Sequence, residues 1–267
     1  EHHLGRRAAT ATVLLLAFAP LSFFFTAVYT ESLFLALAVG SMLAAQRGRF
    51  VLACALGALA TLTRPVGILL AFGLVVGRLR AHGRPDRGLL GVLALPVTLL
   101  AYLGLLAARG YPWLSPFTAQ THWQRVTVGP LAAIVAAVLS AGRGVGSIIA
   151  GAPLYAPQRG GPLAPGDESI VLLAVLVICI AAFISCLRRL PLQYGVLAGA
   201  MLLVTLSSPA IGQPLWSFDR FALTMFPLWM AAGGWAARRR LVWPLVGLGA
   251  TLLVFYTLQF ASWAFVA

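Results

Sequence analysis

The stretch from residue 8 to residue 45 contains a single charged side chain, Glu31. A membrane-spanning helix needs about 20 predominantly apolar residues, so this stretch is too long for one crossing and fits two. Comparable stretches recur along the chain, and only 9% of all residues are charged. So few charges cannot cover a surface that faces water. The sequence therefore predicts an all-α fold, a polytopic transmembrane helical bundle.

All 19 basic residues are arginines, and most stand in short groups between the apolar stretches. Cytoplasmic loops are enriched in such residues, so the groups indicate membrane topology. They form no continuous basic face, and we therefore expect no nucleic-acid partner despite a net charge of +13. The groups that we place in the cytoplasm are at residues 6–7, 47–49, 78–87, 188–189 and 238–240.

This rule gives an alternating path for the helices. We expect a break between Pro20 and Glu31 on the outer face, and a tight hairpin over residues 50–77 with Arg64 at its outer tip. Pro65 would begin the second helix of that hairpin, where its missing N–H costs nothing. Further crossings are predicted at residues 88–107, 169–187, 192–206, 221–237 and 241–263.

One transmembrane domain, residues 1–267, accounts for the whole chain, with an extracytoplasmic segment at about 108–167. This segment is the least hydrophobic part of the sequence. Within it, residues 131–150 are moderately apolar but are interrupted by Gly142-Arg143-Gly144, which favours an interfacial helix over a crossing. The sequence opens without a methionine, and we expect it to be a fragment whose N-terminus lies further upstream.

Three cysteines, Cys54, Cys179 and Cys186, lie inside apolar stretches. Their spacing matches neither a disulfide framework nor a zinc site. We expect them to be small buried side chains, and we expect no metal site and no cofactor.

Ionisable residues outside the arginine groups collect on the predicted outer face: Glu31, Arg64, Asp219 and Arg220, with the segment 108–167. Such residues are costly at membrane depth and often mark a functional site. Arginine binds phosphate oxygens in a bidentate way. A cluster of arginines and acids below an outer loop would therefore suit a lipid-linked phosphate substrate.

Each of these residues also has a purely structural interpretation. Glu31 could complement the dipole of the helix that it begins, and Arg64 could extend to water from a hairpin tip. Asp219 and Arg220 could form a local ion pair of little energetic value. Aromatic residues such as Trp123 are common anchors at membrane borders.

Four sequence blocks suggest a family. They are A-P-L-S-F-F-F-T-A-V-Y-T-E-S-L-F (19–34), G-A-L-A-T-L-T-R-P-V-G (57–67), F-T-A-Q-T-H-W-Q-R (117–125) and S-F-D-R-F-A-L-T-M-F-P-L (217–228). In this order they resemble the PIG-V-type mannosyltransferases, which include the second mannosyltransferase of glycosylphosphatidylinositol assembly and bacterial relatives. The four blocks extend over most of the chain.

The resemblance implies a GT-C-like fold and an inverting mannosyltransferase. The implied donor is a polyprenyl- or dolichyl-phosphate sugar, and the acceptor is a lipid-linked or glycan hydroxyl at the extracytoplasmic face. The implied location is a multi-pass protein among membrane lipids, in the plasma membrane of a bacterium or the endoplasmic reticulum membrane of a eukaryote. No cofactor is implied.

The resemblance also implies which residues take part in catalysis and substrate binding. The main catalytic Asp is expected upstream of the chain, so that Glu31 is the catalytic candidate within it. Asp219 departs from the family pattern, in which this position is often apolar or Pro. The residues expected to bind substrate are Tyr29 beside Glu31, Arg64 and Arg220 at the carrier phosphate, Gln120, Trp123 and Arg125 around the sugar or acceptor, and Asp219 next to Arg220.

Three other functions are compatible with the sequence. A transferase of the same architecture could move a different sugar. A lipid-carrier flippase or small transporter should show paired repeats with broken helices near the membrane midplane, and we find one broken hairpin without a counterpart. A structural subunit of a membrane complex is the third alternative.

Overall fold

The computed structural model describes residues 4–152 and 165–262, which form helices and loops without a β-strand. The end of the predicted outer segment, at 153–164, lies outside the described residues. The elements are α1 (Gly5–Ala17), η1 (Ser22–Phe25), α2 (Glu31–Gln46), α3 (Phe50–Thr63), η2 (Pro65–Leu69), α4 (Leu70–His82), η3 (Arg87–Leu93), α5 (Ala94–Ala108), α6 (Ser115–Thr118), η4 (Ala119–Trp123), α7 (Pro130–Ile149), α8 (Pro165–Arg189), α9 (Leu192–Leu206), α10 (Phe218–Thr224), α11 (Phe226–Arg239) and α12 (Val242–Ala261).

Several of these helices have the length and composition of membrane spans, which confirms the predicted polytopic bundle. In the described part of the chain, five helical segments are long and apolar enough to cross a bilayer. The helices α2, α3 and α9 are apolar but shorter. The five longer segments are Pro65–His82, Arg87–Ala108, Pro130–Ile149, Glu168–Arg189 and Val242–Ala261.

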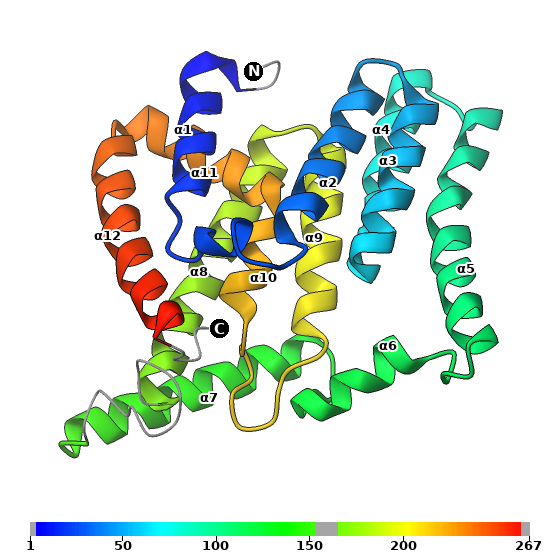
Figure 1. Cartoon of the computed structure of the whole chain (residues 1–267). Coiled ribbons are helices and arrows are strands. Elements are labelled where there is room, and N and C mark those ends of the chain that lie inside the picture. The colour runs from blue at the N-terminus through cyan, green and yellow to red at the C-terminus, as the bar shows by residue number, and fades with distance from the viewer. Residues whose placement is uncertain (1–3, 153–164, 263–267) are drawn as a thin grey trace.

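The two ends of the bundle differ in composition. In Figure 1 the arginine-rich connections gather at the top of the view, after α2, α4, α8 and α11. We call this the arginine end. The helices α6 and α7 lie across the opposite end, beside the loop 207–217, and we call this the α7 end. The connections with arginines therefore lie at one end of the bundle and the others at the opposite end, in the alternating order that the positive-inside rule predicts.

Helix α7 covers the segment for which an interfacial helix is predicted. Its length and composition would allow a crossing, but in Figure 1 it runs across the other helices rather than along them. It packs on α8 and α9 through small residues, of which Ala133, Ala137 and Ser140 are buried. This orientation is the one expected of an interfacial helix, and its position relative to the bilayer stays a prediction.

The hairpin at Arg64 forms where it was predicted. Helix α3 ends at Thr63, and Pro65 is the first residue of η2. Arg64 between them has an extended backbone (φ −149°, ψ 129°). Proline disfavours the helical region for the residue before it, so Pro65 itself ends α3.

The prediction of one continuous crossing at residues 221–237 is wrong. The segment is divided between α10 and α11, and the break is at Met225 (φ −81°, ψ 62°). Pro227 stands in the first turn of α11. A proline fits this position but lacks the N–H that a continuous helix would need, so it separates the two helices.

The core joins helices from both halves of the chain. Large buried side chains from α2, α4, α8, α9 and α10 form one hydrophobic cluster. The three cysteines are free and buried, as predicted. Helix α1 packs closely on α11 at Gly233, which has no side chain. A Cβ at this position would lie 2.2 Å from the Thr12 Oγ1 and would clash with it. Small residues allow such close approach between membrane helices.

Candidate functional site

Glu31 is the centre of an ion-pair cluster that joins three segments of the chain. Its Oε1 accepts a hydrogen bond from Arg64 Nη1 at 2.8 Å and another from Arg220 Nε at 2.8 Å. The three residues come from the start of α2, the break after α3 and the first turns of α10. We call Glu31, Arg64 and Arg220 the outer triad. Two of its members are separated by 189 residues in sequence.

Burial and charge distinguish the members of the outer triad. The Glu31 side chain has no exposed surface, whereas those of Arg64 and Arg220 are 16% and 20% exposed. A buried charge is tolerated when it is paired, and here one carboxylate faces two guanidinium groups. The triad therefore carries one excess positive charge. The Glu31 Oε2 is buried, and no group of the described residues forms a hydrogen bond with it.

The local chain explains why these side chains point inward. Glu31 is in the first turn of α2, where its charge also complements the helix dipole, as the structural alternative proposed. Arg64 is held at the break that Pro65 imposes. Ser217, before α10, has a positive φ of 62° and sets the direction in which that helix begins.

Aromatic rings cover the faces of the guanidinium groups. The Arg220 Cζ lies 4.2 Å from the centroid of the Tyr29 ring and 4.5 Å from that of Phe24. The Arg64 Cζ lies 5.7 Å from the centroid of Phe221. Such cation–π contacts orient a guanidinium while its N–H groups remain available for hydrogen bonds.

Arg125 joins this arrangement from the outer segment. Its Nη1 donates to the Ser208 carbonyl and its Nη2 to the Trp216 carbonyl, both at 2.9 Å. Its Cζ lies 5.2 Å from the centroid of Phe221, the ring that Arg64 also contacts. Arg125 forms no ion pair with any acid of the described residues. It therefore adds positive charge beside the outer triad and fixes the loop 207–217.

Backbone pairing reinforces this link between the outer segment and the loop 207–217. The Val126 N–H donates to the Pro209 carbonyl at 3.0 Å, and the Ile211 N–H donates to the Gln124 carbonyl at 2.9 Å. The two stretches run antiparallel at this point. They form a cover at the α7 end of the bundle.

Three predicted site residues have other surroundings. Gln120 and Trp123 are exposed on η4, and the Trp123 ring packs edge-on against Trp216 with centroids 6.4 Å apart. Neither makes a hydrogen bond to the outer triad within the described residues. Asp219 is no ion-pair partner of the Arg220 side chain, so the proposed local ion pair is absent from the described residues; its Oδ1 accepts the Arg220 backbone N–H at 2.8 Å.

The pKa of Asp219 differs from its ordinary value. Burial of the carboxyl group raises this pKa to about 6, although the hydrogen bond from the Arg220 backbone N–H opposes the change. The nearby Glu168 carboxylate adds to the increase. Glu168 was not among the predicted site residues, and it stands at the beginning of the apolar stretch of α8.

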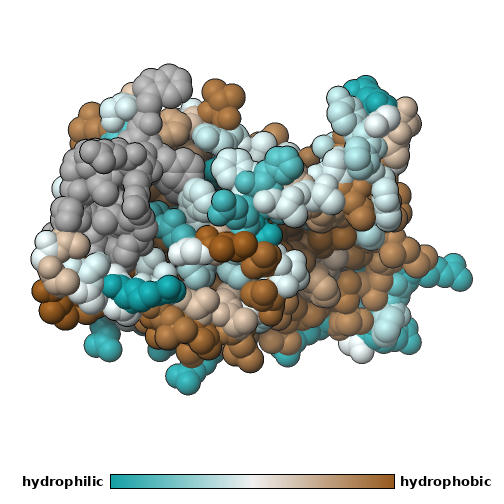
Figure 2. Space-filling model, turned by 90° about the horizontal axis from the view of Figure 1, so that it is seen from below, coloured by the Kyte–Doolittle hydropathy of each residue, from teal (hydrophilic) through white to brown (hydrophobic). Residues whose placement is uncertain are grey.

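A cavity of about 340 Å³ opens at the α7 end, next to the strand-like segment that carries Arg125. Figure 2 views the molecule from this end and shows a group of hydrophilic residues near the middle of the face, bordered by apolar residues, with further hydrophilic residues at the edges. The cavity is mostly apolar, with Arg143 as its charged residue. It is lined by Val126, Val128, Ala132, Ala136, Arg143, Pro209, Ala210, Ile211, Gly212 and Pro214.

No group of three or more His, Cys, Asp or Glu residues in the described ranges could hold a metal ion. Comparison of the chain with models of protein families, with curated proteins and with solved structures gives no match.

Proposed function

We propose that this chain is a membrane glycosyltransferase that moves a mannosyl residue from a polyprenyl- or dolichyl-phosphate donor to a lipid-linked or glycan acceptor. The transfer takes place at the extracytoplasmic face, which corresponds to the α7 end. The observation that carries the proposal is the outer triad. It presents two oriented arginines with excess positive charge at the end of the bundle away from the cytoplasmic arginine groups.

The charge of the outer triad matches the leaving group of such a reaction. The bond between the anomeric carbon and the phosphate oxygen breaks, and a bond from that carbon to the acceptor oxygen forms with inversion. The lipid phosphate leaves with added negative charge. Arg64 and Arg220, each partly exposed, would stabilise this charge with donors that are already in position.

Glu31 has a positioning role in this proposal. Its carboxylate is fully buried and contacts the two arginines, so it holds them in place. The proton of the acceptor hydroxyl passes to a carboxylate base. Glu31 remains the catalytic candidate within the chain if the cluster opens during the reaction.

The polar and apolar surroundings fit a substrate that is both charged and lipid-linked. The apolar cavity beside Arg125 would accept part of the lipid or the acceptor. Gln120 and Trp123 are exposed on the same cover, where they would contact the sugar. Aromatic residues with one polar edge are suited to such amphipathic contacts.

The test is a transfer assay in membrane vesicles that contain the protein. Radiolabelled polyprenyl-phosphate mannose is the first donor, followed by other polyprenyl-phosphate sugars. We expect Arg64→Ala and Arg220→Ala each to lower the transfer rate roughly a hundredfold or more, because each removes one donor to the departing phosphate.

Arg109→Ala is the matched control. Arg109 is exposed after α5 at the α7 end, so its removal changes the charge equally but leaves the outer triad intact. Transfer from a different lipid-phosphate sugar would correct the donor. Absence of transfer from every donor, with the protein correctly inserted, would favour a flippase, transporter or structural subunit.

A further inference from the structure

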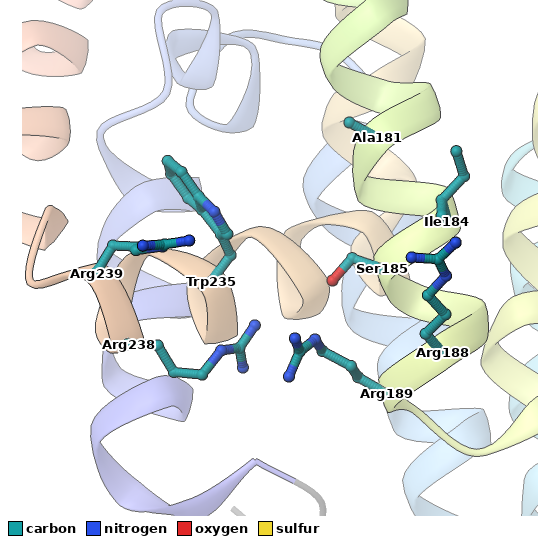
Figure 3. Close-up of a pocket in the computed structure, with 8 residues that line it drawn as sticks. All are labelled: Ala181, Ile184, Ser185, Arg188, Arg189, Trp235, Arg238 and Arg239. Carbon is teal, nitrogen blue, oxygen red and sulfur yellow. The ribbon is translucent and has the colours of Figure 1, made fainter.

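The arginine end contains a second arginine cluster, unrelated to the outer triad. Arg188 and Arg189 in the last turn of α8 and Arg238 and Arg239 in the last turn of α11 line a cavity of about 500 Å³. We call it the arginine pocket. Figure 3 shows its remaining lining residues, Ala181, Ile184, Ser185 and Trp235.

Two of the guanidinium groups of this pocket face each other (Figure 3), and the structure places no acid of the described residues between them. Figure 3 shows the side chains of Arg189 and Arg238 pointing toward one another across the gap between α8 and α11, with the Ser185 hydroxyl beside them. None of the four arginines forms an ion pair with an acid in the described ranges. Like charges that face each other repel, so an anion bound between them would be favourable.

The walls of the pocket indicate the chemistry of that anion. Ala181, Ile184 and Ser185 precede Arg188 by one to two turns of α8 and share a face with it. Ile184 is 43% exposed and Trp235 is 44% exposed. The pocket thus combines guanidinium groups at its cytoplasmic end with an apolar surface that continues toward the bilayer.

We propose that the arginine pocket binds the phosphate group of an anionic membrane lipid. Basic pockets between membrane helices on the cytoplasmic side bind such head groups, and arginine engages phosphate oxygens in a bidentate way. The acyl chains would lie along the exposed part of α8. Free phosphate offers the same oxygens without the acyl chains.

If the arginines of the pocket served only to set the membrane topology, their positive charge would be sufficient and they would not need to line a common pocket. Arg47 and Arg49 also stand at the arginine end, on the exposed connection between α2 and α3, and they line neither of the two cavities described. Arg78 is paired with Asp86. The approach of Arg189 to Arg238 within a pocket that two further arginines line (Figure 3) therefore requires another explanation, which a bound phosphate provides. This binding site is independent of the proposed transferase activity.

The experiment measures lipid binding to the purified full chain by native mass spectrometry, with phosphatidylglycerol, phosphatidylcholine and inorganic phosphate as probes. The test variant is Arg189→Gln with Arg238→Gln. The control, Arg47→Gln with Arg49→Gln, removes the same charge at the same end. We expect the test variant to weaken phosphatidylglycerol binding roughly tenfold or more, and the control to change it by less than about twofold.

A second test variant, Arg189→Lys with Arg238→Lys, keeps the positive charge that determines the membrane topology. It replaces the Gln variant in the experiment if the Gln variant fails to insert into the membrane. We expect it to weaken binding less than Gln, but measurably, because lysine lacks the planar fork of arginine. Arginine-dependent binding of inorganic phosphate, with no gain from the lipid chains, would identify free phosphate as the ligand and overturn the lipid assignment. Equal weakening by the control pair, or no weakening by any pair, would overturn the site.

Discussion

The two arginine clusters of this protein stand at opposite ends of the bundle and differ in how their charge is held. In the outer triad, two arginines share the buried carboxylate of Glu31, and rings cover their faces. In the arginine pocket, four exposed arginines line one cavity, and none of them is paired with an acid of the described residues. The outer cluster is thus preorganised by the protein, and the inner one depends on an anion from outside.

This difference has a physical consequence. Arginines that are oriented before a substrate arrives can stabilise charge that develops during a reaction, because no reorganisation is needed at that moment. Arginines without a partner are suited to binding an anion that is already charged, such as a lipid head group. The same residue type therefore serves the proposed chemistry at one end and the proposed lipid binding at the other.

The largest effect is expected from Glu31→Gln. It leaves two arginines facing each other in a buried setting, and removing one partner from a buried pair costs about 3–5 kcal/mol. Thermal unfolding in detergent measures the loss of stability. Asp86→Asn is the control, because the Arg78–Asp86 pair is partly exposed; it should change the melting temperature little. Equal effects of the two substitutions would contradict the central position of Glu31.

A second substitution separates stability from activity. Replacing Glu31, Arg64 and Arg220 together by Met removes every charge of the outer triad. Apolar residues of similar volume often replace a buried ion cluster without loss of stability. We expect the triple variant to recover most of the stability that Glu31→Gln loses, and to have no transferase activity. A triple variant as unstable as Glu31→Gln would show that the ion pairs themselves hold α2, α3 and α10 together.

A smaller effect is expected at Tyr29, whose ring lies 4.2 Å from the Arg220 guanidinium. A cation–π contact of this kind contributes about 0.5–2 kcal/mol. Tyr29→Leu should therefore lower the transfer rate roughly threefold to tenfold, and Tyr29→Phe, which keeps the ring, should lower it less. Transfer assays on the two variants measure the difference. Equal losses would assign the role of Tyr29 to its hydroxyl group.

The smallest effects concern the dependence of stability on pH, and they have opposite signs at the two ends. Burial raises the pKa of Asp219 to about 6 in the folded state, from an ordinary value of 3.8. The folded state therefore binds a proton more tightly than the unfolded state does. This contribution to stability is complete below about pH 3.8 and is lost as the pH rises through about 6.

Asp86 at the arginine end behaves in the opposite way. Hydrogen bonds from Arg78 lower its pKa below the ordinary value, so its contribution is present above that value and is lost as the pH falls through the lower, folded-state pKa. Melting temperatures across this range check both predictions. Asp219→Asn should flatten the curve between about pH 4 and 6, and Asp86→Asn should flatten it only on the acid side. Unchanged curves in both variants would contradict these assignments.

Local signals in the sequence predicted much of the fold. The break before Glu31 and the hairpin at Arg64 follow from apolar length, arginine placement and a single proline, and the structure confirms them. The division of the segment 221–237 was missed because its overall length and hydrophobicity suit one crossing. Pro227 was the available signal for the division. A proline breaks a helix that begins well before it but is tolerated in the first turn of a new helix, and the sequence does not show which case applies.

The candidate site was only partly predictable. The sequence predicted Glu31, Arg64 and Arg220 on one face of the membrane. Their contacts depend on how α2, α3 and α10 pack against one another, and the spacing of residues in the sequence does not determine this packing. The hydrogen bonds of Arg125 to two backbone carbonyls leave no sequence signal. The arginine pocket was interpreted as two topology signals, and its convergence follows from the packing of α8 on α11.

The most direct test of the central claim is the binding of polyprenyl phosphate, the proposed leaving group, to the purified protein. Affinity is compared among the wild type, Arg220→Ala and the control Arg109→Ala, with the phosphate-free polyprenol as a second ligand. We predict that Arg220→Ala weakens polyprenyl phosphate binding roughly tenfold or more, that Arg109→Ala leaves it unchanged, and that polyprenol binds poorly to all three. Equal affinity of wild type and Arg220→Ala for polyprenyl phosphate would contradict the role of the outer triad in holding the carrier phosphate.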